Sequence, residues 1–154
     1  MFLPKLHGQV HSCIKVEKGD SNSITSKRLK AISDTSYRIF SVDGGHTRET
    51  TLNDLFLAQS VLHKQGFVVL DDFVNSEWLG VVDGLFTFIN KCNGGLKPFL
   101  WLCNKLYLSH ESLHQFFYDS VQKMGAIKCS SMSNIHESRY KVNGYKVCVV
   151  KETG

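Results

Sequence analysis

The chain has 154 residues, a formal net charge of +4, 42% hydrophobic residues and 21% charged residues. This is the composition of an ordinary globular protein, and we expect a single domain over residues 1–154 with a poorly structured N-terminus over residues 1–12. The densest basic group, Lys27-Arg28-Lys30, lacks the arginine-rich run and interleaved aromatics of a nucleic-acid surface. No apolar stretch is long enough to span a bilayer. Composition therefore argues against nucleic-acid and membrane partners.

Cysteine usage indicates a reducing compartment. The five cysteines are far apart and form no C-x-x-C pair, which argues against a zinc site: Cys13, Cys92, Cys103, Cys129 and Cys148. Their apolar surroundings predict buried, reduced thiols. The N-terminus also lacks the long apolar run of a signal peptide, so we expect a cytoplasmic protein.

The N-terminal third begins with weak signals. Ile14 and Val16 alternate with charged residues over Cys13–Glu17, a pattern typical of a half-exposed strand. The turn Gly19-Asp20-Ser21 follows. Ser23–Ile32 then predicts a short helix, with Ser21 or Ser23 as its cap.

A βαβ unit is the strongest pattern in the chain. Tyr37–Val42 is a short β-prone run, and Thr47–Gln65 has apolar residues at helical spacing, with Gly66 as the residue expected to end the helix. Phe67–Leu70 is a continuous apolar run, as in a strand buried on both faces. A strand, a crossover helix and a second strand predict parallel strands.

The remaining chain predicts two helices, one strand region and a hairpin. The aromatic residues Trp78, Phe86 and Phe88 are expected in the core. The predicted elements are a helix capped by Ser76 and running to Cys92, a strand over Pro98–Cys103 that continues through Lys105–Leu108, a helix over Ser109–Met124, a mobile loop over Ser130–Ser138, and strands Tyr140–Val142 and Tyr145–Val150 around Asn143-Gly144.

Acidic residues follow both strands of the βαβ unit. Asp43 comes directly after the first strand, and Asp71 and Asp72 come directly after the second. Because parallel strands end at the same edge of a sheet, these carboxylates and His46 should meet on one rim, where open α/β sheets bind ligands. Oxygen ligands suit Mg²⁺, Ca²⁺ or Mn²⁺, and a histidine beside them suits a general base. The alternative is structural: each aspartate could simply cap a helix or begin a turn.

These motifs resemble a known family. The segments VEKGDS, IFSVDGGHTRETTLNDL, LHKQGFVVLDDF and PFLWLCNKLYLSH are similar to class I S-adenosylmethionine-dependent methyltransferases, in particular the metal-dependent O-methyltransferases of macrolide and cephamycin biosynthesis. The resemblance implies a partial Rossmann-like α/β sheet with helices on both faces and an antiparallel C-terminal hairpin. It also implies Mg²⁺ held by Asp43, Asp71 and Asp72, His46 as catalytic base or donor contact, and Asp20 and Ser21 beside the adenine of S-adenosylmethionine.

The sequence departs from this family at its start. The family begins with a strand and a glycine-rich turn that bind the donor, and the residues before Cys13 cannot hold them. We therefore expect a C-terminal portion of an O-methyltransferase that acts on a small-molecule hydroxyl, and self-association or a second chain at the gap left by the absent strands.

Two alternatives stay open. One is a pseudoenzyme or partner-binding module that has lost donor binding. The other is a metal-dependent phosphoryl or glycosyl transferase, for which the chain offers no phosphate-binding glycine loop, and only Lys105 and Arg139 as candidate basic groups.

Overall fold

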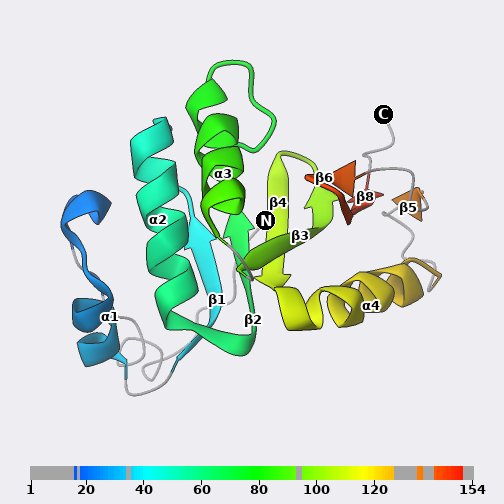
Figure 1. Ribbon diagram of the computed structural model, residues 1–154, viewed down its shortest axis with the longest axis horizontal. Coiled ribbons are helices and arrows are strands. Elements are labelled where there is room, and N and C mark those ends of the chain that lie inside the picture. Colours follow the sequence, from blue (N-terminus) through cyan, green and yellow to red (C-terminus); the bar gives the residue numbers. More distant parts are fainter. Residues whose placement is uncertain are drawn as a thin grey trace, which may run out of the picture.

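A mixed sheet with helices on both faces forms the body of the molecule. The computed structural model describes residues 16, 18–33, 36–92, 95–126, 135–136 and 141–150. Their main sheet has six strands in the order β1-β2-β4-β3-β8-β5. Helices α2 and α3 cover one face and α4 covers the other (Figure 1). The predicted α/β class, with helices on both faces, is confirmed.

Alternating side chains explain the two covered faces. Along β2, Val68 and Leu70 belong to the core under α2 and α3, whereas Phe67 packs toward Phe117 of α4. Strand β4 divides its residues in the same way, with Leu106 and Leu108 on the first face and Tyr107 on the second. This period of two is what a strand buried on both sides requires.

The βαβ unit has the predicted topology. Strand β1 (Tyr37–Val42) is parallel to β2 (Leu62–Leu70), and α2 (Arg48–Val61) joins them. Thr47 caps the helix, because its side chain accepts a hydrogen bond from the Thr50 amide at 3.2 Å. The parallel pairing of these two strands, as expected from the sequence, is thereby established.

The predicted end of α2 is wrong. The helix stops at Val61, and Leu62–Leu70 is already strand, with an irregular register against β1 before Phe67. Gly66 therefore lies within β2 and does not end the helix. A Cβ at Gly66 would lie 2.6 Å from the carbonyl oxygen of Arg38, so the glycine permits the close approach of the two strands.

The arrangement of strands β3 (Leu96–Leu102) and β4 (Lys105–His110) differs from the prediction. The sequence predicts that one strand continues past Asn104, but the chain reverses at Cys103-Asn104 and the two strands pair antiparallel. Cys103 adopts a left-handed backbone with φ 54°. Strand β4 then inserts between β2 and β3, and is antiparallel to both. The sheet is therefore mixed in the region where a parallel core is predicted.

The later helices begin later than predicted. Helix α3 (Leu79–Lys91) starts after Trp78, without a side-chain cap from Ser76. Ser109 and His110 belong to β4, a 3-10 turn covers Glu111–Leu113, and α4 spans His114–Ala126. Phe88 is buried as predicted, but Trp78 and Phe86 are 40% and 37% exposed, so the predicted aromatic core is only partly formed.

The predicted C-terminal hairpin forms at Asn143-Gly144, but its second strand ends at Lys146 rather than at the predicted Val150. Strands β6 (Lys141–Val142) and β7 (Tyr145–Lys146) pair antiparallel. Asn143 and Gly144 have φ values of 48° and 83°, the mirror-image turn that Asn-Gly favours. Strand β8 (Cys148–Val150) then joins β3 in parallel, and β5 (Ile135–His136) pairs with β8. The rest of the predicted loop Ser130–Ser138 lies outside the described residues.

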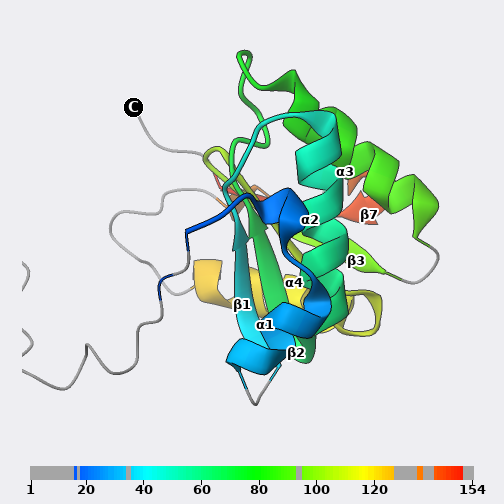
Figure 2. The same ribbon diagram turned by 90° about the vertical axis from the view of Figure 1, so that its left-hand side faces the viewer.

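The N-terminal helix α1 (Ser26–Ile32) lies beside α2 (Figure 2). Thr25 caps it rather than Ser21 or Ser23, which belong to a 3-10 turn, η2 (Ser21–Ser23). The predicted strand Cys13–Glu17 lies outside the described residues except for Val16, which is not in a strand. The expected disorder of residues 1–12 also lies outside them.

The cysteines differ in exposure. Cys148 is buried, and burial raises its pKa to about 11. Cys103 is exposed, so the prediction of buried thiols is wrong for this residue. Cys13 and Cys129 lie outside the described residues. No described helix is both long enough and apolar enough to cross a membrane.

Candidate functional site

The candidate site lies at the carboxyl ends of β1 and β2. Asp43 follows the last residue of β1, and Asp71 and Asp72 follow the last residue of β2. The Asp71 amide donates to the Val42 carbonyl at 3.0 Å, so the two strand ends stay in register up to the acidic residues. Both strands point toward the same edge of the sheet (Figure 1). The parallel topology is what gathers these carboxylates on one rim.

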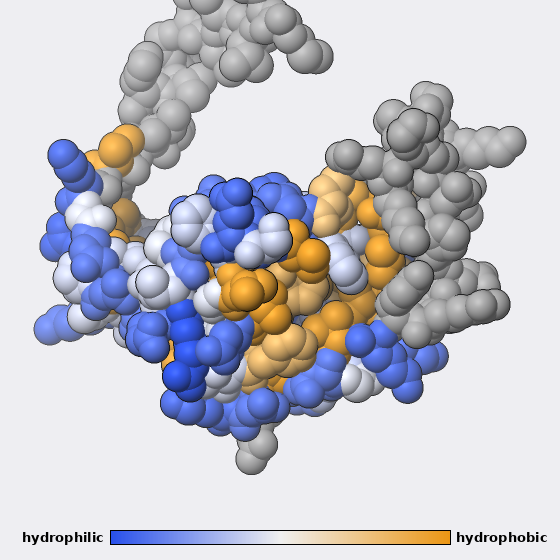
Figure 3. Space-filling model, turned by 90° about the horizontal axis from the view of Figure 1, so that it is seen from above, coloured by the Kyte–Doolittle hydropathy of each residue, from blue (hydrophilic) through white to orange (hydrophobic). Residues whose placement is uncertain are grey.

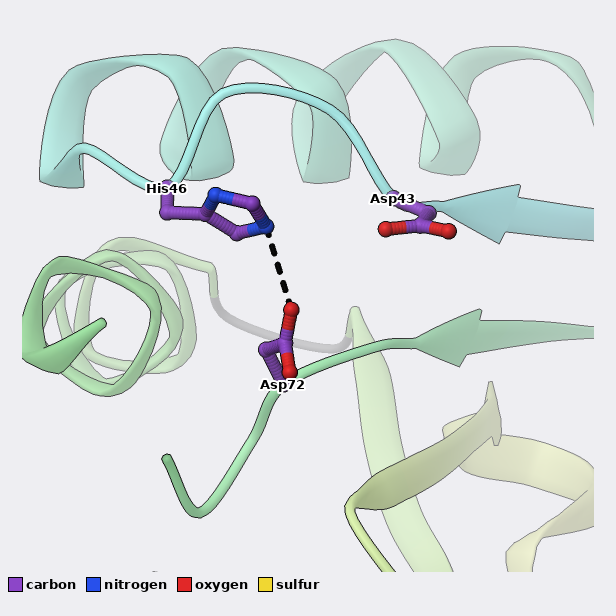
Figure 4. A group of neighbouring side chains, drawn as sticks. All are labelled: Asp43, His46 and Asp72. Atoms are coloured by element: carbon purple, nitrogen blue, oxygen red, sulfur yellow. Dashed lines mark ion pairs between the residues drawn. The ribbon is translucent and has the colours of Figure 1, made fainter. Parts of the chain in front are cut away.

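Three side chains converge on this rim: Asp43, His46 and Asp72. Each offers one ligand atom, and these atoms all lie within 4.8 Å of one another. The His46 ring points at Asp72, with 3.1 Å between Nε2 and Oδ2, and Asp43 lies at the end of β1 (Figure 4). Nε2 is buried and makes no aligned hydrogen bond, although Asp72 Oδ2 lies 3.1 Å away. The structure thus leaves this nitrogen without a hydrogen-bond partner among the described residues.

Neighbouring groups hold His46 and Asp72 in place. Trp78 stacks on the His46 ring, with 4.4 Å between ring centroids and 25° between the planes. Asp72 has φ 53°, a backbone conformation that non-glycine residues rarely adopt. Its Oδ1 accepts from Asn75 Nδ2 at 3.0 Å and from Asn104 Nδ2 at 3.3 Å, while Oδ2 faces His46. One carboxylate oxygen is therefore anchored and the other is presented to the site.

Asp71 has different partners. Its Oδ2 pairs with the ammonium of Lys105, and its Oδ1 accepts from Asn104 Nδ2 at 2.9 Å and from the Asp72 amide at 2.8 Å. Burial acts to raise the pKa of Asp71, but the hydrogen bonds from Lys105 and the Asp72 amide outweigh it and the pKa is lowered. The hydrogen bond to Asp71 is also the main cause of the raised pKa of Lys105. The structure therefore does not bring Asp71 into the group formed by Asp43, His46 and Asp72.

The two residues predicted to contact adenine, Asp20 and Ser21, belong to the turn η2 and its cap, not to the group formed by Asp43, His46 and Asp72. The Asp20 carboxylate accepts from the Asn22 amide at 3.0 Å and caps η2. Ser21 Oγ donates to Asp54 Oδ2 at 3.3 Å. Ser21 and Asp43 both line a cavity of about 240 Å³ between α1, the end of β1 and α2. Apolar side chains supply much of its remaining wall: Ile24, Leu29, Phe40, Val42 and Leu57.

Asp54 and Trp78 are the site residues that sequence reasoning misses. Asp54 also lines the cavity, is only 6% exposed, and has an Oδ1 atom without a hydrogen-bond partner. Burial raises the pKa of this carboxyl, the hydrogen bond from Ser21 opposes the rise, and the charge of Asp20 adds to it. A carboxylate on the buried stripe of a helix, beside Leu55 and Ala58, is a signal that could have identified Asp54.

Comparison with known proteins adds family information. A family model described as a methyltransferase domain matches residues 4–73, just under half of the chain. That segment contains every predicted site residue. No curated protein matches the sequence.

The chain is similar to two solved structures of the calicheamicin methyltransferase CalS11, at 20% identity and with a TM-score of 0.47. One of them is described as the apo structure of a TDP-rhamnose 3'-O-methyltransferase. The matches cover 60% of this chain but only 39% and 35% of theirs, so the chain spans well under half the length of these proteins. The family match agrees with the resemblance seen in the sequence, over residues 4–73.

Proposed function

We propose that the chain is part of an enzyme that transfers a methyl group from S-adenosylmethionine to a hydroxyl group of a small molecule. The observation that carries the proposal is the convergence of Asp43, His46 and Asp72 on one rim, within the segment that matches a methyltransferase domain. In this reaction the bond from sulfur to the methyl carbon breaks and a bond from the acceptor oxygen to that carbon forms. Sulfur keeps the electron pair, and the hydroxyl proton must leave.

His46 is the residue we assign to that proton. Its Nε2 lacks an aligned hydrogen-bond partner, and stacking on Trp78 fixes the ring plane. The carboxylate of Asp72 lies 3.1 Å from Nε2 and stabilises the ring once it carries a positive charge. Asp72 therefore acts as a positioning residue for the base, as well as a candidate ligand.

The donor set fits a divalent cation. Asp43 and Asp72 would hold Mg²⁺ through carboxylate oxygens, with His46 left as the base; if His46 were itself a ligand, the set would favour Mn²⁺ or another metal that accepts imidazole. When bound, such a cation would lower the pKa of an acceptor hydroxyl. Asp71, also expected as a ligand from the resemblance, is engaged by Lys105 and Asn104, so we propose that it supports the site without binding the metal.

The cavity beside Asp43 is the proposed donor site. Its apolar wall suits the flat face of an adenine ring, and Ser21 and Asp54 supply polar groups at one side. Asp20 caps η2 and does not line the cavity. We therefore retain Ser21, and not Asp20, as the direct contact.

Metal titration tests the proposal. We expect Mg²⁺ or Mn²⁺ to bind the chain in calorimetry, and the variants Asp43→Asn and Asp72→Asn to weaken binding at least about tenfold, because each removes a charged ligand. Asp71→Asn is the matched control, since it changes the same side chain one residue away and should leave affinity within about threefold. Equal losses in Asp71→Asn and Asp72→Asn would contradict our assignment of the ligands.

A further inference from the structure

Strand β1 forms one edge of the main sheet, and part of its backbone has no partner. The Val42 carbonyl accepts from the Asp71 amide, so the backbone groups of Val42 and, two residues earlier, of Phe40 face β2. The backbone groups of Ile39 and Ser41 alternate with these and face away from the sheet. Within the described part of the chain, no hydrogen bond reaches them. A free edge of this kind binds a further strand unless something blocks it.

Helix α1 stands beside this edge and limits what fits there. Leu29 of α1 lines the same cavity as Phe40 and Ser41 of β1, and the Leu29 carbonyl accepts from the Tyr37 hydroxyl at 2.9 Å. Figure 2 views the molecule from this side, with α1 in front of β1. A second sheet that carries its own helices would collide with α1. A single extended segment has no such helices, so the edge suits one strand.

A strand at this edge would have one covered and one exposed face. Toward α1 it would meet the apolar residues Ile24 and Leu29. On the other face of the sheet α4 packs on β3, β4 and β8, and Ile39 of β1 is 61% exposed. Seen from above, the end that carries α1 and η2 is mainly hydrophilic, while hydrophobic residues gather in the middle of the face (Figure 3). The occupant should therefore alternate apolar and polar side chains.

The chain itself carries a segment with this pattern. Cys13–Glu17 alternates Ile14 and Val16 with Lys15 and Glu17. In the structure Val16 is 88% exposed and lies outside any strand, so its apolar side chain has little cover. Docking of the segment against β1 and α1 would remove this side chain from water, which is favourable.

The position of η2 sets the direction in which this segment would run. Ser21 Oγ donates to Asp54 Oδ2, and a Cβ at Gly44 would lie 3.8 Å from Ser21 Oγ, so η2 begins beside the carboxyl end of β1. Residues 18–20 separate Glu17 from this point. Three residues span up to about 10 Å, whereas neighbouring strands lie about 4.8 Å apart. A segment that ends beside the end of β1 runs parallel to β1.

We propose that Cys13–Glu17 adds to the free edge of β1 as a parallel strand, with Ile14 and Val16 toward α1 and the alternate side chains toward solvent. The strand would lie beside Ser41 and so extend the wall of the cavity that we assign to the methyl donor. The inference goes beyond the proposed function and does not depend on methyl transfer.

A cross-link in the whole chain tests the pairing. The proposed direction places Glu17 level with Asp43 and Cys13 level with Ile39, with the last two side chains on the solvent face. Under mild oxidation we expect Ile39→Cys to form an intrachain disulfide with the natural Cys13, identified by peptide mapping. Arg38→Cys is the matched control, because its side chain points to the other face. It should give at least about tenfold less of this link.

Amide hydrogen exchange tests the same pairing without an added cysteine. We expect the Ile39 and Ser41 amides to exchange at least about tenfold faster in Val16→Asp than in the unmodified chain, because the new charge would face α1 and release the strand. Lys15→Asp is the control, since it changes the neighbouring residue on the solvent face, and it should leave both exchange rates within about twofold.

Three results would overturn the inference. The first is a disulfide between two copies of Ile39→Cys together with a dimer in sedimentation, which would assign the edge to a second copy. The second is equal cross-linking of Cys13 in Ile39→Cys and Arg38→Cys. The third is exchange of the Ile39 and Ser41 amides at the unprotected rate in the unmodified chain. None of these readouts uses a metal or a donor, so they are independent of the tests of the proposed function.

Discussion

Asp71 and Asp72 are adjacent residues with different roles. Both lie in the turn after β2, where Asp71 pairs with Lys105 and Asp72, with its left-handed backbone, faces His46. Asp71 therefore neutralises a lysine and ties the turn between β3 and β4 to the end of β2, while Asp72 faces the site. The backbone of the turn therefore separates two carboxylates that look equivalent in the sequence.

The Asp71 ion pair predicts a pH dependence of stability. Because the folded pKa of Asp71 is lowered, its contribution to the free energy of unfolding is present above the ordinary carboxyl pKa of about 4 and is lost as pH falls through the folded value. Asp71→Asn should lower stability at neutral pH by no more than about 1 kcal/mol, since Lys105 is 39% exposed, and should flatten the loss in acid. Urea unfolding at several pH values measures both effects.

Asp83→Asn is the control for this comparison. Asp83 also pairs with a cation, Arg48, but its side chain is 63% exposed and solvent screens the pair. Its pH profile should match that of the unmodified chain. If the two variants had the same profile, Asp71 would not be the source of the acid dependence.

At the scale of elements, the close approach of β1 and β2 depends on Gly66. A methyl group there would meet the backbone of Arg38, which cannot move without separating the strands. Gly66→Ala should therefore cost about 1–3 kcal/mol in urea unfolding. Gly19→Ala, at a position with no atom within 4 Å of the added Cβ, should be nearly neutral. Equal stability of the two variants would show that the strands have room to adjust.

Elements defined by local signals were predictable from the sequence. Strand β1, the start of α2 and the Asn143-Gly144 hairpin each depend on neighbouring residues alone. The misplaced boundaries depend on distant contacts. Helix α2 ends at Val61 because the following residues pair with β1, and the chain turns at Cys103 because β4 fills the place beside β2.

The candidate site follows the same division. Asp43, His46 and Asp72 could be placed on one rim because parallel strands end together. The partner of Asp71 could not, because Lys105 is 34 residues away, across a turn that the sequence did not reveal. Trp78 fits an apolar helical pattern, and nothing local shows that its ring stacks on a histidine.

At the scale of the whole molecule, we expect the cavity beside Asp43 to bind the donor product. S-adenosylhomocysteine with Mg²⁺ should raise the thermal midpoint of the chain, because a ligand that binds only the folded state adds about 2.7 kcal/mol at a hundredfold excess over its dissociation constant. Asp54→Asn tests the cavity, because Asp54 is buried in its wall. Asp83, in contrast, is exposed and is not among the residues that line the cavity. Asp54→Asn should reduce the ligand-induced shift.

A cooperative melt whose midpoint does not change with S-adenosylhomocysteine would contradict donor binding by this chain and favour a non-catalytic module. A chain without a cooperative melt would need a further polypeptide to complete its fold. The first result would leave the rim residues without a methyl donor. The second would assign the activity to an assembly.

The stacking of Trp78 on His46 also gives the site its own optical signal. The chain has two tryptophans, so Trp101→Phe leaves Trp78 as the sole long-wavelength emitter. Mn²⁺ bound beside His46, as proposed, is paramagnetic and would quench the emission of a ring 4.4 Å from that imidazole, whereas diamagnetic Mg²⁺ would not quench by this route. Tryptophan emission would therefore report competition between the two ions at the proposed site without a label.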